Sequence, residues 1–191
     1  MTIKAKKNFK IIPKITDSQY YKYKKNNFFL ETISLQHIEM LRKWKNKHRQ
    51  YFFLKEIISK ESQFNWFKDY QKRIDDFIFV VNYNGLKIGC IGFRIIDDVV
   101  DIYNVILANK KFSKKGIMSF CLSLLCSYLF DYYFTKFKYS ITVRVLIDNS
   151  ARSWYEKNHF IEIKEKEDHV LMKLDISKLK YIDYEIIEFK I

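Results

Sequence analysis

Residues 99–132 read VVDIYNVILANKKFSKKGIMSFCLSLLCSYLFDY, and this stretch decides the fold because a strand, a loop and a helix follow one another in it. Apolar and polar residues alternate from Val100 to Tyr103, and Val105–Ala108 is fully apolar, which indicates a strand that becomes buried on both faces. From Ile117 to Tyr128, apolar residues recur at intervals of three and four and so share one face of a helix. The stretch also holds Gly116, the only glycine after Gly92.

The loop between the strand and the helix, Asn109–Gly116, suits an anion site. The free N–H groups of the first helical turn and the positive end of the helix dipole lie at its end, and Gly116 lets a phosphate approach the backbone because it has no Cβ. Positive charge is added by Lys110, Lys111, Lys114 and Lys115. One interpretation is a cradle for a diphosphate, and the other is an ordinary loop in which Ser113 caps the helix and the lysines are only solvated. This stretch alone does not decide between them.

The composition is typical of one globular domain. A chain of 191 residues fits a single domain, and 48% hydrophobic residues supply a substantial core. The formal net charge is +13, but the lysines are spread over nearly every segment and no aromatic–basic motif of an RNA-binding sheet is present. We therefore expect small anionic molecules as partners, and no nucleic acid.

Cysteines, histidines and hydropathy exclude other classes of protein. The cysteines are odd in number and lie among apolar residues, as core thiols in a reducing compartment do: Cys90, Cys121 and Cys126. The histidines lack metal-ligand spacing: His37, His48, His159 and His169. The basic start of the chain has no apolar run of signal-peptide length, and no stretch reaches membrane-spanning length. We expect a cytoplasmic protein without a metal and without membrane insertion.

The rest of the chain predicts an α/β (α+β) domain with a mixed sheet, because strands and helices alternate only in part. Besides the strand at 99–108, strands are expected at 28–32, 77–83, 86–96, 140–147, 160–164 and 170–175. Asn84-Gly85 indicates a hairpin between the second and third of these. Helices are expected from Ser34 through Trp44, around 64–67, at 117–128 and from 148–150 to Asn158. We divide the chain into an N-terminal extension (1–27), a domain (28–175) and a tail (176–191) that adds an edge strand or contacts a partner.

Two motifs in this order of elements resemble a known family. FSKKGIMS at 112–119 is similar to a pyrophosphate loop written as Gln or Arg, two variable residues, Gly, one variable residue, and Gly or Ala. NSARSWYEKNHF at 149–160 is similar to a segment that starts at an asparagine and ends in Tyr, three residues, Gly and Phe. Both belong to the GNAT superfamily of acetyl-CoA-dependent N-acetyltransferases, and the resemblance covers roughly Phe28 to Asp175. The sequence departs from the motifs at Ser113, Met118 and His159, and Asn149 stands six residues before Tyr155 where seven is more common.

The resemblance implies a mixed, mostly antiparallel sheet of about six to seven strands with helices on both faces, and acetyl-CoA as cosubstrate without a metal. It assigns the opened strand to the pantetheine arm, the loop to the pyrophosphate and an asparagine to CoA. These cofactor-binding residues are Ile106, Leu107, Ala108, Ser113, Lys114, Lys115, Gly116, Ile117, Met118, Ser119 and Asn149. It assigns Tyr155 the role of general acid, whereas the alternative is an aromatic residue that packs beside Trp154.

The chemistry that the family implies needs three partners. A neutral amine attacks a thioester carbonyl, a backbone donor stabilises the oxyanion, and the leaving thiolate takes a proton, which Tyr155 can supply. No carboxylate is tied by a motif to the role of base. Glu31, Glu56 and Asp98 are equal candidates, and a chain of water molecules suffices for an amine that is already partly neutral.

A further resemblance rests on WKN at 44–46, followed by Ser59, Gln63 and Trp66. These residues are similar to the branch of the family that holds nucleotide-sugar N-acetyltransferases and ribosomal-protein N-terminal acetyltransferases. The residues assigned to the acceptor are Trp44, Asn46, His48, Arg49 and Trp66. We expect a nucleotide-linked amino sugar, because a diphosphate suits a basic protein and aromatic rings can stack on a nucleobase. Acetylation of a protein N-terminus, a non-catalytic CoA-binding module and a homodimer remain open at this point.

Overall fold

The computed structural model describes residues 8–14, 27–97, 99–134 and 140–189. The strands in this part of the chain are β1 (Phe9–Pro13), β2 (Phe28–Thr32), β3 (Asp76–Tyr83), β4 (Leu86–Ile96), β5 (Val99–Leu107), β6 (Ser140–Leu146), β7 (Phe160–Glu165), β8 (His169–Leu174) and β9 (Tyr184–Glu188). The α-helices are α1 (Ile38–Lys47), α2 (Lys60–Lys72), α3 (Ile117–Leu129) and α4 (Ala151–Lys157). Each predicted strand and helix is present, with shifts of a few residues at the ends.

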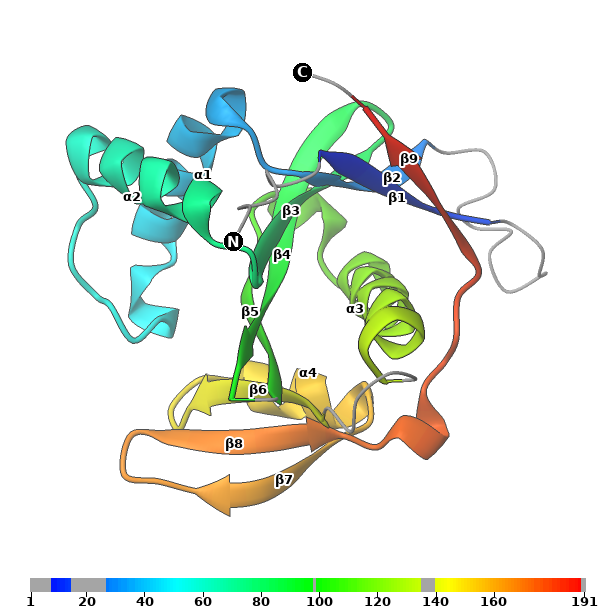
Figure 1. Ribbon diagram of the computed structural model, residues 1–191. Helices are drawn as coiled ribbons and strands as arrows, with labels where there is room; N and C mark the ends of the chain where they lie inside the picture. The colour runs from blue at the N-terminus through cyan, green and yellow to red at the C-terminus, as the bar shows by residue number, and fades with distance from the viewer. Residues whose placement is uncertain (1–7, 15–26, 98, 135–139, 190–191) are drawn as a thin grey trace.

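All nine strands found in the described residues form one sheet, in the order β7-β8-β6-β5-β4-β3-β2-β1-β9. Only β5 and β6 pair in parallel; the other neighbours are antiparallel. The predicted mixed, mostly antiparallel sheet is therefore confirmed. It has more strands than the six or seven expected, because β1 and β9 pair with each other beyond β2 (Figure 1).

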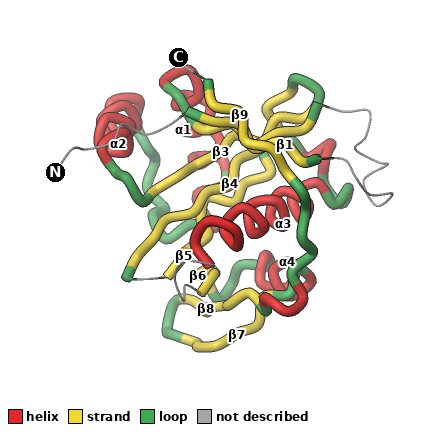
Figure 2. The backbone as a smooth tube through the Cα atoms, turned by 45° about the vertical axis from the view of Figure 1, so that its right-hand side comes forward, coloured by secondary structure: helices red, strands yellow, loops and turns green. Residues whose placement is uncertain are grey.

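Helices cover both faces of the sheet, as predicted. α1 and α2 lie on one side of β3–β5 and α3 lies on the other (Figures 1 and 2). The α1–α2 side has its own core, in which Leu41 and Phe67 meet Val80 and Ile106. The larger core lies under α3 and α4.

α3 is apolar on nearly every side because it is covered on more than the sheet face. The chain between β8 and β9 passes around it (Figure 1), and Ile182 N–H donates to Ser127 Oγ at 2.9 Å. The ring of Tyr184 also meets that of Tyr128 at 6.1 Å between centroids. Burial of this helix fixes the position of its N-terminus, where the lysine-rich loop ends.

Candidate functional site

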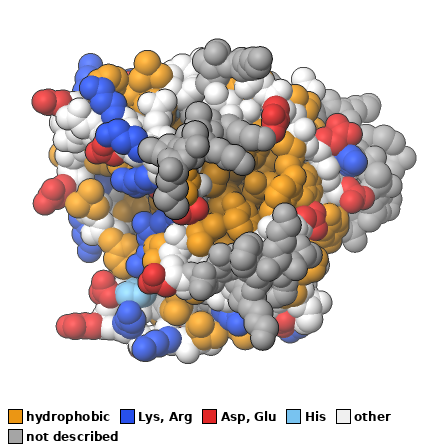
Figure 3. Space-filling view, viewed as in Figure 1, with side chains coloured by type: hydrophobic (Ala, Val, Ile, Leu, Met, Phe, Trp, Pro, Cys, Tyr) orange, Lys and Arg blue, Asp and Glu red, His pale blue; other side chains and the backbone are white. Residues whose placement is uncertain are grey.

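A cleft opens where β5 and β6 part. Their parallel pairing runs from Val99↔Ser140 to Ile102↔Val143 and stops there, although β5 continues to Leu107 and β6 to Leu146. The space of about 460 Å³ that follows is bounded by both strands, by the connection from α1 to α2, and by α4. Figure 3 shows Lys and Arg side chains gathered between the α1–α2 side of the molecule and the β6–β8 end.

An irregularity in β5 turns its backbone at the cleft. The register with β4 shifts between Cys90 and Gly92, and Asn104 has a left-handed φ of +53°. Asn104 Nδ2 is buried and has no hydrogen-bond partner among the described residues. An unpaired buried donor is costly, and the amide nitrogen of Asn104 has no hydrogen bond within the described part of the chain that would offset the cost.

The three residues assigned to the pantetheine arm separate in the structure. Ile106 and Leu107 line the cleft, whereas Ala108 N–H donates to Ile88 O at 2.9 Å and so faces β4. Gly89 permits the close approach of these strands, since a Cβ on it would stand 2.2 Å from Ile106 O. The turned edge of β5 is therefore held from the β4 side while its β6 side is open.

The loop before α3 has the geometry of an anion cradle. Gly116 is the residue that precedes α3 and has a left-handed φ of +74°, and Lys114 has a φ of +59°. The first helical hydrogen bond runs from Phe120 N–H to Gly116 O at 3.0 Å. The N–H groups of the intervening residues, 117–119, therefore have no acceptor within the helix and mark the positive end of its dipole.

Ser113 does not cap α3, so the alternative of an ordinary loop with a serine cap is wrong in that respect. Ser113 ends the short 3-10 turn Lys110–Phe112, and α3 has no side-chain cap at Gly116. Met118 is 8% exposed and packs in the core, so it does not narrow the loop. Ser119 Oγ accepts from Trp154 Nε1 at 3.0 Å, which ties α4 to the first turn of α3.

The second motif begins at the cleft. Asn149 lines it, and Asn149 Oδ1 accepts from Ala151 N–H at 2.9 Å at the start of α4. At the other end of the motif, His159 has a φ of +66°. This is the left-handed conformation that glycine adopts most easily, so the departure from the family's glycine does not change the backbone.

Tyr155 belongs both to the core and to the cleft. Its side chain is 5% exposed and its ring contacts Trp154 and Phe160, yet it lines the cleft wall. Burial, followed by the charge of Asp101, raises the pKa of the hydroxyl above its usual value. The hydroxyl is therefore protonated throughout the neutral range, which is the form that a proton donor needs.

The residues assigned to the acceptor divide into two groups. His48, Arg49 and Trp66 line the cleft, and Trp66 carries Lys45 Nζ at 5.6 Å from its ring centroid. Asn46 instead braces the α1–α2 connection: its side chain donates to Ile58 O at 3.0 Å and accepts from Ile58 N–H at 2.9 Å.

Trp44 is also outside the cleft lining, and it packs against the core under α1 and α2. Burial and neighbouring lysines lower the pKa of His48, so its ring is neutral at neutral pH.

The polar floor of the cleft was not found by sequence reasoning. Asp101, 5% exposed, lies between Arg94 and Arg144. Beside it, Tyr103 donates to Asp76, which also pairs with Arg73 at 3.0 Å. The available signal was the period of two, which places Asp101 and Tyr103 on one face of β5.

Cations outnumber carboxylates around the cleft. Among the described residues, its lining includes five Lys and Arg side chains, Lys45, Arg49, Arg73, Arg94 and Arg144, against two carboxylates, Glu56 and Asp101. Such a surrounding lowers the pKa of an amine that enters it. It therefore favours the neutral amine that attacks a carbonyl, and a strong base becomes less necessary.

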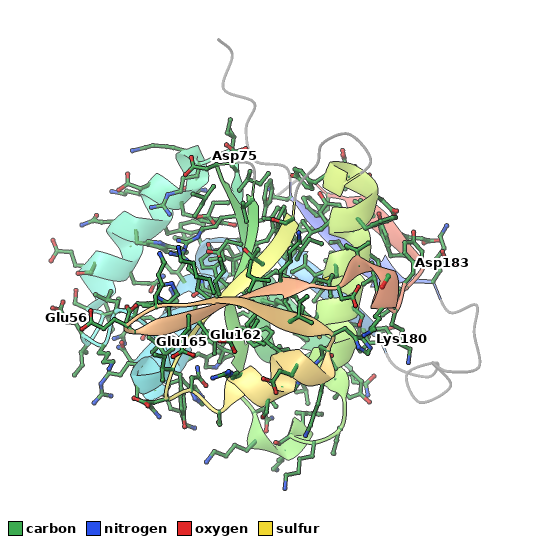
Figure 4. The ribbon with its side chains drawn as sticks, turned by 90° about the horizontal axis from the view of Figure 1, so that it is seen from below. Glu56, Asp75, Glu162, Glu165, Lys180 and Asp183 are labelled. Carbon is green, nitrogen blue, oxygen red and sulfur yellow. The ribbon has the colours of Figure 1, made fainter. Side chains whose placement is uncertain are left out.

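The three carboxylates considered as bases differ in position. Glu31 lies in β2 and is not in the cleft lining. Glu56 is exposed and lines the cleft from the α1–α2 connection, at the edge of the molecule (Figure 4). Asp98 lies outside the described residues.

Other features of the described residues bear on the remaining expectations. No group of three or more His, Cys, Asp or Glu side chains that could hold a metal ion is found in this part of the chain. All three cysteines are buried and unpaired. None of the described helices has the length and apolar character needed to cross a membrane.

Comparison with known proteins gives the following matches. A sequence model of the acetyltransferase (GNAT) family matches residues 38–160. No curated protein sequence matches the chain. Three solved structures illustrate the similarity in fold.

The first is apo FdhC, described as a nucleotide-linked sugar GNAT, with 16% identity, 80% of this chain and 89% of that chain covered, and a TM-score of 0.64. The second is the Campylobacter jejuni N-acetyltransferase PseH in complex with acetyl coenzyme A, with 20% identity, coverage of 77% and 97%, and a TM-score of 0.58. The third is the ribosomal alpha-N-protein acetyltransferase RimL in complex with coenzyme A, with 16% identity, coverage of 76% and 92%, and a TM-score of 0.61.

Proposed function

Because the chain belongs to the GNAT acetyltransferase family, we propose that it transfers the acetyl group of acetyl-CoA to a primary amine, and that this amine is carried by a nucleotide-linked amino sugar. The observation that carries the choice of acceptor is the excess of five Lys and Arg side chains over two carboxylates around the cleft. A nucleotide diphosphate supplies negative charge to match it.

The described residues fit acetyl-CoA. The N-terminus of α3 suits the pyrophosphate, because it presents free N–H groups and Gly116, in a left-handed conformation, has no Cβ to hinder a phosphate that approaches the backbone. The unpaired edge of β5 at Ile106 and Leu107 suits the amide groups of the pantetheine arm. Acetyl-CoA supplies a thioester whose carbonyl accepts the amine and whose sulfur leaves as a thiolate.

Two groups of the chain are suited to assist that step. The amide of Asn104 is buried, unpartnered and in the cleft lining, so it can donate a hydrogen bond to a carbonyl oxygen as negative charge develops. Tyr155 is protonated and faces the cleft, so its hydroxyl can donate to the leaving sulfur. The raised pKa makes Tyr155 a weak acid on its own, so its hydroxyl passes its proton to the sulfur as its oxygen takes up the proton that the attacking amine loses.

The similarity in fold to FdhC and to RimL is compatible with either a nucleotide sugar or a protein N-terminus. The charge of the cleft favours the first. A basic protein substrate is repelled by a chain with a formal net charge of +13. An amino group on a sugar ring is also less basic than a lysine side chain, because electron-withdrawing oxygens surround it, and it needs only a weak base.

The test is direct competition between acceptor classes. Acetyl-CoA is supplied with a panel of UDP- and dTDP-linked amino sugars and with a panel of N-terminal peptides, and thiol release is followed. Turnover of at least one nucleotide sugar faster than every peptide is expected, with inhibition by free UDP or dTDP. Faster turnover of a peptide than of every nucleotide sugar would establish the second candidate, a protein N-terminal acetyltransferase. Release of no thiol with any amine would favour a non-catalytic CoA-binding protein.

A further inference from the structure

Two arginines from different strands are held by one carboxylate on the floor of the cleft. Arg94 of β4 donates from Nε and Nη2 to Asp101 Oδ2, each at 2.9 Å, and Arg144 of β6 donates from Nη2 to the same oxygen at 2.9 Å. Asp101 lies in β5, next to the last residue at which β5 and β6 still pair. Both guanidinium groups are therefore fixed at the point where the cleft opens.

These arginines retain donors for a ligand. A guanidinium has five N–H donors, and Asp101 engages two groups of Arg94 and one of Arg144. Both side chains line the cleft and are about one-third exposed, at 35% and 36%. Arg94 lies over the ring of Tyr103 at 4.9 Å and Arg144 lies 6.0 Å from the ring centroid of Phe53.

The charges at this point do not balance. One carboxylate serves two guanidinium groups, and no described carboxylate pairs with the nearby Lys45, whose Nζ lies over Trp66. Burial lowers the pKa of Lys45; the charges of Cys90 and Asp76 oppose this shift, and the charge of Arg94 adds to it. Like charges held this close together and partly buried repel one another, and an anion that joins them relieves the repulsion.

From this geometry, and resting on the proposed function, we propose that Arg94 and Arg144, positioned by Asp101, bind the diphosphate of the acceptor, with Lys45 adding charge from the α1 side. Guanidinium groups match phosphate oxygens with paired donors, and two of them on separate strands can each take one phosphoryl group. The site is distinct from the cradle at the start of α3, which serves the pyrophosphate of CoA. The protein thus has two anion sites, one for each substrate.

The experiment separates the two sites by first filling the CoA site, so that any further anion must bind elsewhere. The protein is saturated with CoA, and UDP and inorganic diphosphate are titrated into it by calorimetry. Arg144→Gln removes one guanidinium from a partly exposed position and is expected to weaken both ligands by roughly 10- to 100-fold, the usual range for a lost charge-assisted hydrogen bond. Arg144→Lys keeps the charge without the paired donors, so its affinities for both ligands should lie between those of the wild type and those of Arg144→Gln.

Lys72→Gln is the matched control, because it removes one positive charge from the exposed last turn of α2, outside the cleft. It should leave both affinities within about twofold, as expected for an exposed charge that makes no contact with the ligand. Circular dichroism and unchanged CoA affinity confirm that each variant is folded. If Arg144→Gln fails to fold, Arg144→Lys alone carries the test.

The outcomes distinguish this proposal from the proposed function. If nucleotide sugars are acetylated but Arg144→Gln and Arg144→Lys bind UDP and diphosphate as the wild type does, the arginine site is wrong and the function stands. If no nucleotide sugar is acetylated but diphosphate binds the wild type and not Arg144→Gln, the site stands and the acceptor is another phosphorylated amine. If neither UDP nor diphosphate binds the CoA-saturated wild type, the arginine site is overturned.

Discussion

Replacement of Gly116 by alanine tests the diphosphate cradle at the residue on which it depends. Gly116 has a φ of +74°, a conformation that costs an L-residue roughly 1–2 kcal/mol. We therefore expect Gly116→Ala to lower the melting temperature of the free protein by about 2–8 °C, since 1 kcal/mol corresponds to roughly 2–4 °C for a chain of this size. That loss reports only backbone strain, so the informative quantity is the stabilisation by CoA.

CoA at a hundredfold excess over its dissociation constant should stabilise the wild type by about 2.7 kcal/mol. In the variant, the added methyl group displaces the phosphate from a backbone N–H. Loss of a charge-assisted hydrogen bond of roughly 1.5–3 kcal/mol weakens binding about 10- to 100-fold. At the same CoA concentration the stabilisation then falls to about 0.4–1.4 kcal/mol, which thermal unfolding with and without CoA measures readily.

Gly85 provides a matched control. It has a φ of +76° in the turn between β3 and β4, and a Cβ there would meet nothing within 4 Å. Gly85→Ala should show the same loss of stability in the free protein and keep the full stabilisation by CoA. If Gly116→Ala also keeps the full stabilisation, the loop before α3 is not the phosphate site and the assignment of residues 113–119 fails.

Two further predictions concern Tyr155 and His37. Tyr155→Phe keeps the contacts with Trp154 and Phe160, so CoA affinity and stability should be unchanged while kcat falls by roughly 10²–10⁴; an unchanged kcat in the folded variant would assign the proton donor to another group. His37 is fully buried beside Ser34, and burial lowers its pKa to about 4. The folded state therefore favours the neutral ring, so this contribution to stability is fully present above pH 6.5 and is lost as the pH falls toward 4. At 1.36 kcal/mol per pKa unit, the free energy of unfolding should fall by up to roughly 3 kcal/mol. Denaturant unfolding across this range measures the loss, and His37→Gln, which can serve the same capping box without titrating, should flatten it; an equal slope in both proteins would contradict the assignment.

The local elements followed from the sequence because their causes are local. The alternation around Asp101 and the helical spacing from Ile117 are consequences of the periods of strand and helix. The hairpin at Asn84-Gly85 reflects the left-handed conformations that both residues adopt, with φ values of 52° and 76°. The position of Gly116 at the start of a helix could also be predicted, because the first turn of any helix has free N–H groups whatever surrounds it.

The wider sheet and the division of residues within the cleft did not follow from the sequence. β1 joins the sheet by pairing with β2, and β9 joins it through residues more than 170 positions away in β1, from Phe9↔Glu188 to Pro13↔Tyr184. Asn46 was assigned to the acceptor, but its hydrogen bonds with Ile58 brace the chain. No sequence pattern near Asn46 predicts that its side chain pairs with Ile58.

The sequence by itself determined the order of elements from β2 to β8, the position of the loop before α3 and the family, because each depends on residues close together in the chain. Only the tertiary structure decided which charges meet. Arg94, Asp101 and Arg144 come from three strands, and their contact depends on β6 pairing in parallel with β5 after a helix has intervened. The geometry of the cleft floor is set by long-range strand pairing, and such pairing leaves no periodic signal in the residues that it brings together.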